Sequence, residues 1–448
     1  MRSKNAKVRI IFSSVIAMLF SGSFFALPQA NAQGDPSIPI DNFIFIIQEN
    51  HSFDNYFGTF PGANGIPANT ALPDFPGGPL VEKPFLGQPS VPNMVHTWVV
   101  TKLAYDNGAM DGFLWAEWPE TAAYYAHAYS ITAPTPDPTL VKPRCPTPRP
   151  RSTPKIGPTP PPLSKRPSWV KNTLSYLDYT VIPNYWEYAR KFTLCDAFFS
   201  SIQSGSLSNH LYSVAAQSGG FVGNNVTCLD FFFPCVVDLL GDANISWTYY
   251  TGDTPTKETL WNPLPGFQAF EKDSHFKVLP HLASTERFYR DLKKGTLPQL
   301  SYLIPDGDES EHPPKDVRVG MRYVTKLVNA VMQSNYWQHC AIIIIWDDYG
   351  GFYDHVSPPQ IDTLGYGFRV PALVISPYSQ VGVVHTTYDL TSLLKLIETK
   401  FNLPPLTPRD SSSNTMLECF NFEQAPLPPV IITPETELDF SDMVTGKP

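Results

Sequence analysis

Two pairs of polar residues follow directly on short apolar runs. Glu49 and Asn50 come after "FIFII", and Asp347 and Asp348 come after "IIIIW". In open α/β sheets, ligands bind beyond the carboxyl ends of the strands, so two such pairs can face one crevice. Adjacent carboxylates repel each other unless a cation or donors neutralise them, and their oxygens suit calcium, magnesium or manganese, with zinc or iron also allowed. Taken separately, the same residues fit loop charges and helix caps.

The segment "SIQSGSLSNHLYS", residues 201–213, offers a nucleophile. Ser206 lies between Gly205 and Leu207, and the residues after it predict a helix. A serine at a glycine-supported turn before a helix has backbone donors nearby, which suit an anionic substrate. The same position also suits a serine that only caps the helix. Because the pattern is not G-x-S-x-G, it does not indicate an α/β-hydrolase nucleophile elbow.

Three histidines lie among loop residues, where a core-packing role is less natural: His96, His312 and His355. Near neutral pH a histidine can donate a proton to a leaving oxygen or hydrogen-bond a phosphate. The remaining histidines without such a setting are predicted to be surface or packing residues, namely His51, His127, His275, His281, His339 and His385.

Short runs that are rich in Ile, Val and Phe are typical of buried strands in a parallel sheet. The sequence predicts such strands at residues 43–47, 300–305, 342–346 and 373–375. Apolar residues recur at helical spacing over residues 317–331 and 393–401. Strands that alternate with helices predict an α/β sandwich, whose sheet would bring the polar pairs to one edge.

Residues 131–168 differ from the rest of the chain in composition. They contain 13 prolines and seven basic residues but only one acidic residue, Asp137. Proline removes backbone donors and favours extended, solvated chain, so we expect a surface insertion or a rigid spacer. Binding to a cell wall or to a partner is the alternative. The flanking segments each lack a complete strand–helix set, so we expect one domain, residues 33–448, that carries this insertion.

The first 32 residues have the pattern of a secretory signal peptide. Four basic residues precede an apolar run at residues 10–27, and "ANA" at 30–32 resembles a cleavage site. An uncleaved anchor is the alternative, although serines and a glycine interrupt the run. We therefore expect a secreted, periplasmic or cell-surface protein.

Without this segment the chain has 28 basic and 41 acidic residues, a formal charge of −13, which argues against a nucleic-acid groove and against charge-driven docking on anionic lipid.

The chain has six cysteines, at positions 145, 195, 228, 235, 340 and 419. An exported, oxidising destination permits disulfides. Cys228 and Cys235 flank "LDFFFP" and lack the further cysteine and histidine ligands of a zinc finger at the usual spacing. The sequence therefore favours a local disulfide between them over a metal site.

Several ordered segments together resemble one family: "ENHSFDNYFG", "YLDYTVIPNYWEYARKFTLCDAFFSS", "EHPPKDVRVGMRYV", "WDDYGGFYDHVSPP" and "GFRVPALVISPYS". They are similar to the bacterial phosphoesterases, which include phospholipases C and acid phosphatases and belong to the alkaline-phosphatase-like superfamily. The similarity runs from about residue 40 to residue 409, apart from the proline-rich insertion.

The resemblance implies an α/β/α sandwich around a mostly parallel sheet, with one divalent metal ion at the carboxyl edge. The metal ligands that it implies are Glu49, Asn50, Asp347, Asp348 and Ser206. Most members have glutamate at the position of Asp348, so this ligand is shorter here. The family segment G-P-T-x-P-N matches "SGSLSN" at Ser206 and Asn209, with Ser204 as a rival nucleophile.

The resemblance also implies that His96, Asn50 and Asn209 contact the phosphate, and that His312 or His355 protonates the leaving oxygen. We therefore expect a secreted, metal-dependent, phospholipase C-like hydrolase that forms a phosphoserine. An acid phosphatase stays open as an alternative, because serine is the usual nucleophile in that branch. An inactive binding module on the same fold is a further alternative.

A phospholipid substrate would require transient contact with a membrane surface. The aromatic segments 113–118 and 228–235 are candidates for that contact, and packing under a loop is the other interpretation of both.

Overall fold

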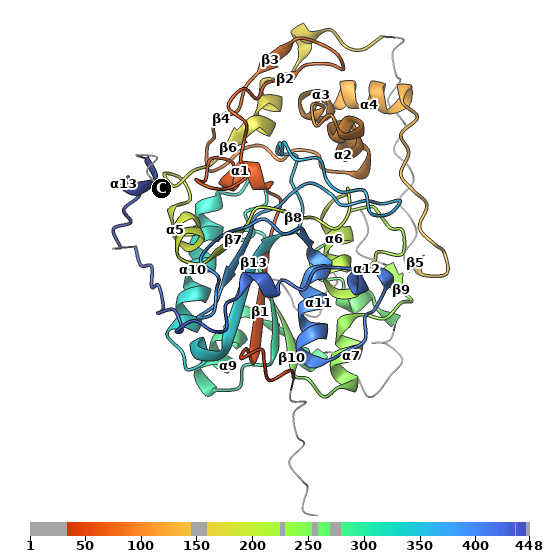
Figure 1. Cartoon of the computed structure of the whole chain (residues 1–448). Coiled ribbons are helices and arrows are strands. Elements are labelled where there is room, and N and C mark those ends of the chain that lie inside the picture. The colour runs from red at the N-terminus through yellow and green to blue at the C-terminus, as the bar shows by residue number, and fades with distance from the viewer. Residues whose placement is uncertain are drawn as a thin grey trace, which may run out of the picture. The chain divides into compact units, whose positions relative to one another are not determined.

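The computed structural model describes residues 34–144, 159–224, 229–252, 259–268, 279–434 and 436–444. An eight-stranded sheet runs through it in the order β11-β10-β12-β1-β13-β14-β7-β15 (Figure 1). The bounds of these strands, in that order, are Leu282–Ser284, Trp247–Thr251, Leu300–Ile304, Asn42–Gln48, Cys340–Trp346, Ala372–Ile375, Thr193–Cys195 and Gly382–Val384. β1 pairs in parallel with β12 on one side and β13 on the other, which explains why residues 43–47 are apolar on both faces.

The register between β1 and β13 determines where the two polar pairs fall. Gln48, the last residue of β1, lies opposite Trp346, the last residue of β13. Glu49 and Asp347 therefore leave the two strands side by side at the same edge of the sheet. A shift of one residue would turn every side chain of the strand to the other face and would move Glu49 by about 3.3 Å along the strand relative to Asp347.

One predicted strand has the opposite direction to its neighbours. β14 pairs antiparallel with both β13 and β7, so the expectation that residues 373–375 form a parallel strand is wrong. Burial on both faces does not encode direction. A parallel crossover needs a long connection, usually with a helix, and the chain between β13 and β14 forms no helix in the structure.

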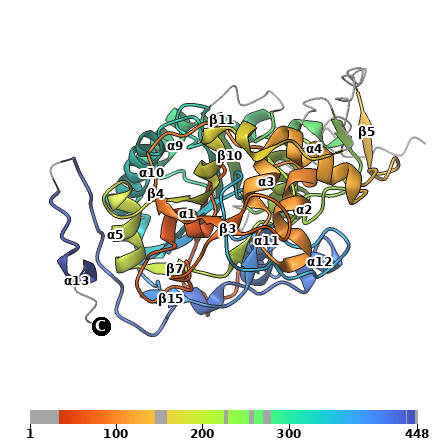
Figure 2. The same cartoon turned by 90° about the horizontal axis from the view of Figure 1, so that it is seen from above.

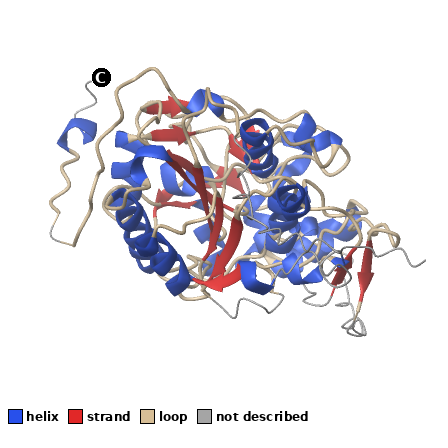
Figure 3. Ribbon diagram, turned by 90° about the horizontal axis from the view of Figure 1, so that it is seen from below, coloured by secondary structure: helices blue, strands red, loops and turns tan. Residues whose placement is uncertain are grey.

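Helices cover both faces of the sheet (Figures 1 and 3). One layer contains α5, α9 and α10, with bounds Pro183–Lys191, Thr285–Lys294 and Val317–Met332. The other contains α6, α7 and α11, with bounds Ser206–Ala215, Val236–Asp242 and Leu390–Phe401. The predicted α/β/α sandwich with a mostly parallel sheet is confirmed, and the helices expected at 317–331 and 393–401 are α10 and α11.

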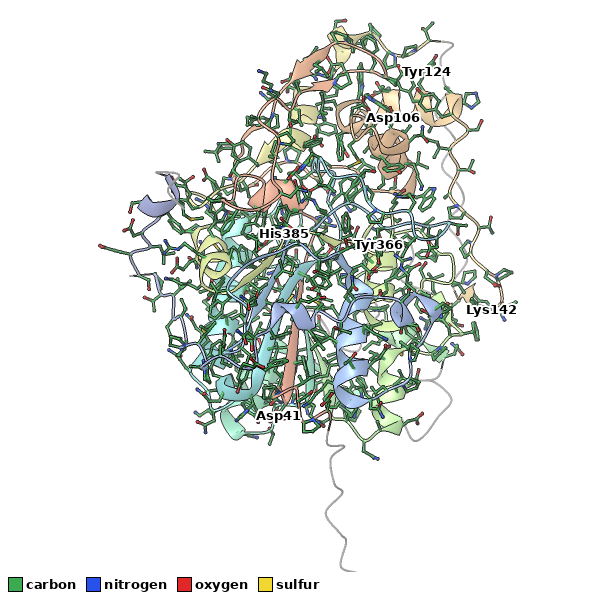
Figure 4. The ribbon with its side chains drawn as sticks, viewed as in Figure 1. Asp41, Asp106, Tyr124, Lys142, Tyr366 and His385 are labelled. Carbon is green, nitrogen blue, oxygen red and sulfur yellow. The ribbon has the colours of Figure 1, made fainter. Side chains whose placement is uncertain are left out.

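A group of short elements, which we call the cap, lies beyond the carboxyl end of β1 (Figures 1 and 2). It comprises β2 (Leu72–Pro73), β3 (Leu80–Glu82), β4 (Phe85–Leu86), α2 (Trp98–Tyr105), α3 (Phe113–Glu117) and α4 (Pro119–Ala128). In Figure 4, Asp41 marks the start of β1 at the lower end of the sheet, whereas Asp106 and Tyr124 of the cap lie at the top. The cap has its own apolar cluster, so it can hold loops over the carboxyl edge.

The aromatic segment 113–118 belongs to the interior of the cap. Phe113, Trp115 and Trp118 are each at most 2% exposed, so they pack within the cap and present no aromatic surface to a lipid. In the other aromatic segment, Phe231 and Phe233 are buried and Phe232 is 37% exposed. Packing is therefore the correct interpretation of segment 113–118.

The two described ends of the proline-rich segment contact the folded chain. β5 (Val141–Pro143) pairs antiparallel with β9 (Leu229–Phe231). Arg166 forms ion pairs with Asp74 and Glu82. The ends of this segment are thus anchored to the domain and do not form a free linker, while residues 145–158 lie outside the described residues.

The expected disulfide is not formed at Cys235. Cys235 is a free, buried cysteine at the N-cap of α7, where its sulfur accepts from the backbone of Asp238. Cys228 lies outside the described residues, as do residues 1–33 with the expected signal peptide. No helix in the described ranges has the length and apolarity that crossing a bilayer requires.

Candidate active site

Glu49, Asn50 and Asp347 meet directly beyond β1 and β13. The backbone N–H of Asn50 donates to Asp347 Oδ1 over 3.0 Å. Asn50 has a φ of 57°, a left-handed conformation that asparagine tolerates better than most residues. Gly350 makes room for this turn, because a Cβ at Gly350 would lie 2.1 Å from the Asn50 carbonyl oxygen and its φ is +62°.

Ser206 faces these strand ends from the first turn of α6. Asn50 Nδ2 donates to Ser206 Oγ over 3.2 Å, and Ser206 Oγ donates to Asp348 Oδ2 over 3.4 Å. Gly205 is the N-cap of α6, so Ser206 is not the capping residue that its position in the sequence also allowed. The structure therefore brings all five predicted metal-ligating residues to one place, with the amino end of a helix beside them.

The neighbouring polar residues of this loop have other partners. Ser204, the rival nucleophile, donates its hydroxyl to the Val222 carbonyl over 2.6 Å. Asn209 accepts from the backbone N–H groups of Ser201 and Ile202 and donates to the carbonyls of Ser204 and Gly205. Asn209 thus holds the loop that carries Ser206, and it has no free polar atom for the phosphate contact we expected of it.

Three carboxyl groups are packed together here without a lysine or arginine partner among the described residues. Glu49, Asp347 and Asp348 are fully buried, and no lysine or arginine among the described residues forms an ion pair with them. Burial, together with the charges of both aspartates, raises the pKa of Glu49 well above its usual value. Burial likewise raises the pKa of Asp347, and that of Asp348 to about 7. Such a cluster is costly unless protons or a cation neutralise it.

Unpaired oxygen atoms show that the cluster fits a divalent cation. Glu49 Oε2, Asn50 Oδ1 and Asp347 Oδ2 are buried and have no hydrogen-bond partner in the described part of the chain. Buried polar atoms in native proteins almost always have a partner, so three orphaned oxygens at one point call for an explanation. An ion bound by carboxylate and amide oxygens supplies it.

His210 also belongs to this cluster, although its sequence pattern did not indicate a site residue. Its Nε2 lies 2.8 Å from Glu49 Oε1 and 3.9 Å from Asp347 Oδ2. Burial lowers the pKa of His210 to about 4, so the ring is neutral near neutral pH. The signal that could have found it is its spacing, since residues four apart on a helix share a face and His210 follows Ser206 by one turn.

His96 and His312 lie next to each other near the acidic cluster. Their ring centroids are 5.9 Å apart, and each Nδ1 bonds a backbone carbonyl, that of Met94 for His96 and that of Pro313 for His312. Burial lowers the pKa of both rings, while the charge of Asp347 acts on both in the opposite direction. Neither Nε2 has a hydrogen bond to another described residue, so each is available to a ligand.

His355 has a different environment from the one we expected. Its Nδ1 lies 2.7 Å from Asp54 Oδ2 and its Nε2 lies 3.2 Å from Asn64 Oδ1. Asp54 and Asp354 also hold the guanidinium of Arg369 at 3.0 and 2.9 Å. These carboxylates already have a cation, so the group formed by Asp54, Asp354 and His355 is a structural ion cluster, and no contact in the described residues joins His355 to Ser206.

Glu311 anchors the loop that carries His312, and its sequence pattern did not indicate this role either. Its buried carboxylate accepts from Tyr185 Oη at 2.6 Å, Tyr56 Oη at 2.7 Å and Trp346 Nε1 at 3.0 Å. Burial raises the pKa of Glu311 to about 8, and the three donors act against that rise. Because Glu311 precedes His312 directly, these donors fix the backbone from which the His312 ring projects.

Known proteins are similar to this chain over most of its length. A family model described as the Phosphoesterase family matches residues 40–404. Phospholipase C A of Mycobacterium tuberculosis is 29% identical over 86% of this chain and 78% of its own length. Phospholipase C B of the same species is 26% identical over 94% of this chain and 86% of its own length. A solved structure of an alkaline phosphatase superfamily protein from Vibrio parahaemolyticus has 13% identity and a TM-score of 0.36, covering 53% of this chain and 64% of that chain.

The raised pKa values predict that cation binding depends on pH. Since the pKa of Asp348 is about 7, protons occupy the cluster below that pH and compete with the ion. The dissociation constant for Mn²⁺, measured by calorimetry on chelator-treated protein, should therefore rise by about 10- to 100-fold from pH 8 to pH 5.

Two variants sharpen this measurement. Asp347→Asn should lose both the binding and its pH dependence, whereas Asp308→Asn, which changes a side chain that is 80% exposed, should keep both. Mn²⁺ affinity that is equal at the two pH values would contradict the proton competition.

The Glu311 contacts predict an ordered pair of stability losses. Glu311→Ala leaves three buried donors without an acceptor and should lower the free energy of unfolding by about 3 kcal/mol or more. Tyr185→Phe removes one donor and leaves the carboxylate with the other two, so it should cost about 1 kcal/mol. Denaturant unfolding measures both, and equal losses for the two variants would show that Glu311 does not hold this loop.

Proposed function

This chain belongs to the Phosphoesterase family, hydrolases that act on phosphoric esters, and on that premise we propose that it is a phospholipase C-like enzyme with Ser206 as its nucleophile. The observation that carries the proposal is the position of Ser206 Oγ, 3.2 Å from Asn50 Nδ2 and 3.4 Å from Asp348 Oδ2, at the edge of a buried acidic cluster. Phosphodiester headgroups of phospholipids are the proposed substrate class, supported by relatives named phospholipase C.

The acidic cluster supports a single divalent cation as cofactor. Glu49, Asn50, Asp347 and Asp348 would hold it through the oxygens described above, with Ser206 Oγ beside them. When bound, the ion would neutralise charge on the phosphoryl group and make the serine hydroxyl more acidic. Calcium, magnesium, manganese and zinc all accept such oxygen ligands.

In the first step, the Ser206 oxygen attacks phosphorus and its proton passes to Asp348, the carboxylate that already accepts the hydroxyl. The bond from phosphorus to the leaving alcohol breaks as the new bond forms. The amino end of α6 faces the phosphoryl oxygens, because Ser206 is its first residue. Burial disfavours the imidazolium form of His312 and the charge of Asp347 favours it; in that form His312 gives its Nε2 proton to the leaving oxygen, and His96 beside it binds the phosphate.

In the second step, water attacks the phosphoserine and His312, now neutral, accepts a proton from it. The bond between phosphorus and the serine oxygen breaks, and Ser206 recovers a proton from Asp348. The products are the alcohol and the phosphorylated headgroup. His355, which the sequence also suggested as the acid, has Asp54 and Asn64 as partners, so this role goes to His312.

A phosphomonoesterase is the second candidate, and the serine itself is the observation that favours it. This chain has a serine, Ser206, at the position where phospholipases of the resembled family more often have threonine. The two candidates use the same cluster and differ in the substrate that they release.

Ser206→Ala should lower turnover by at least about 10³-fold while the protein stays folded, because the substitution removes only the hydroxyl. Ser204→Ala is the matched control in the same loop, since its hydroxyl bonds the Val222 carbonyl, and it should keep most of the activity. A folded Ser206→Ala variant with wild-type turnover would exclude the assignment.

The substrates for this assay are p-nitrophenyl phosphorylcholine and p-nitrophenyl phosphate, each with and without a chelator. Release from the diester that the chelator abolishes supports the phospholipase. Release from the monoester alone would establish the phosphatase instead.

Export is part of the proposal and rests on the basic and apolar pattern of residues 1–32. Expressed from its full-length gene in a bacterial host, the protein should be recovered outside the cytoplasm with an amino terminus near Gln33. Edman sequencing of that fraction tests this, and a cytoplasmic protein that retains Met1 would contradict export.

A further inference from the structure

His210 and Glu49 form a buried contact that the catalytic scheme above does not use. Both side chains are fully buried, and His210 Nε2 lies 2.8 Å from Glu49 Oε1. His210 projects from α6 one turn after Ser206, so one helix presents the proposed nucleophile and this imidazole on the same face. The other oxygen of the carboxylate, Glu49 Oε2, has no partner among the described residues.

The partners of the imidazole indicate which nitrogen carries its proton. His210 Nδ1 is buried and has no hydrogen-bond partner in the part of the chain that the structure describes. A histidine that binds a metal through Nε2 carries its proton on Nδ1 and nearly always donates it to an acceptor. No acceptor meets His210 Nδ1, so a proton there would be a stranded buried donor. A proton on Nε2 is used at once by Glu49.

We propose that His210 is a positioning residue for the cation site: its Nε2–H fixes Glu49 Oε1, so that Glu49 Oε2 faces the cation between the ends of β1 and β13. This inference rests on the proposed cation site. The imidazole is not itself a ligand. It restricts the rotation of a glutamate that has three side-chain torsions and that two neighbouring carboxylates would otherwise repel.

The proposal gives α6 a second purpose. Ser206 faces Asp348 at the end of β13, and His210 faces Glu49 at the end of β1. The helix therefore sets the distance between Ser206 and Glu49. The helix is itself held at the next turn, where Ser213 Oγ donates to the His210 carbonyl over 2.8 Å and Tyr302 Oη donates to the Ser213 carbonyl over 3.0 Å. Movement of α6 would displace the nucleophile and the cation ligand together.

The test compares His210→Leu with His210→Gln in the full-length protein. Leucine fills similar volume and donates no hydrogen bond, whereas glutamine can place an N–H close to the position of Nε2. On chelator-treated protein, calorimetry should show a dissociation constant for Mn²⁺ that is about 10- to 100-fold higher for His210→Leu than for the wild type. The dissociation constant of His210→Gln should stay within about threefold of the wild-type value. Thermal unfolding without metal serves as the control for folding.

The outcomes separate this inference from the proposed function. Wild-type protein that binds no Mn²⁺ would remove the cation site itself. Wild-type binding that His210→Leu retains in full would overturn only the role of His210. If His210→Leu does not fold, histidine ¹⁵N NMR of the Mg²⁺-loaded or Zn²⁺-loaded wild type decides, with His210→Gln used for assignment. A proton on Nε2 of His210 supports the proposal, and a deprotonated Nε2 overturns it.

Discussion

The parallel register between β1 and β13 is the constraint on which the candidate site depends. It ends two buried strands at the same level and so brings Glu49-Asn50 against Asp347-Asp348. Each strand is buried on both faces, and a shift of one residue between them would move Glu49 by about 3.3 Å along the strand relative to Asp347. This arrangement packs together three buried carboxyl groups whose basic neighbour, His210, is neutral near neutral pH. The proposed cation would offset the cost of burying these carboxyl groups, and it would also enable the cluster to act on a phosphate ester.

Two other buried charged residues, Arg369 and Glu311, have partners outside the strand-end cluster. Arg369 is a buried cation, and Asp54 and Asp354 hold it in a separate ion cluster. Glu311 is surrounded by Tyr56, Tyr185 and Trp346, so its carboxylate is occupied by its own donors. Among the described residues, Arg369 and Glu311 thus have partners of their own, whereas Glu49 Oε2 and Asp347 Oδ2 at the strand ends have none.

The sequence predicted the parts of the fold and site that local patterns encode. Apolar runs followed by acidic residues located β1, β13 and the candidate ligands at their ends, and helical spacing located α10 and α11. It could not assign the direction of β14, because burial on both faces is the same in either direction. Nor could the sequence show the environment of His355. A histidine next to an aspartate in a loop has the same local sequence whether its ring faces a substrate or an internal carboxylate. Asn209 matched a family position by spacing, but its contacts within the Ser201–Gly205 turn appear only once the loop is folded.

The most direct test of this account is a crystal structure of the protein grown with Mn²⁺, with anomalous scattering used to locate the ion. The account predicts one strong peak between the ends of β1 and β13, about 2.0–2.6 Å from oxygens of Glu49, Asn50, Asp347 and Asp348, with Ser206 Oγ adjacent. An ion bound instead at Asp54 and Asp354, or a strand-end cluster that stays empty at saturating Mn²⁺, would contradict it.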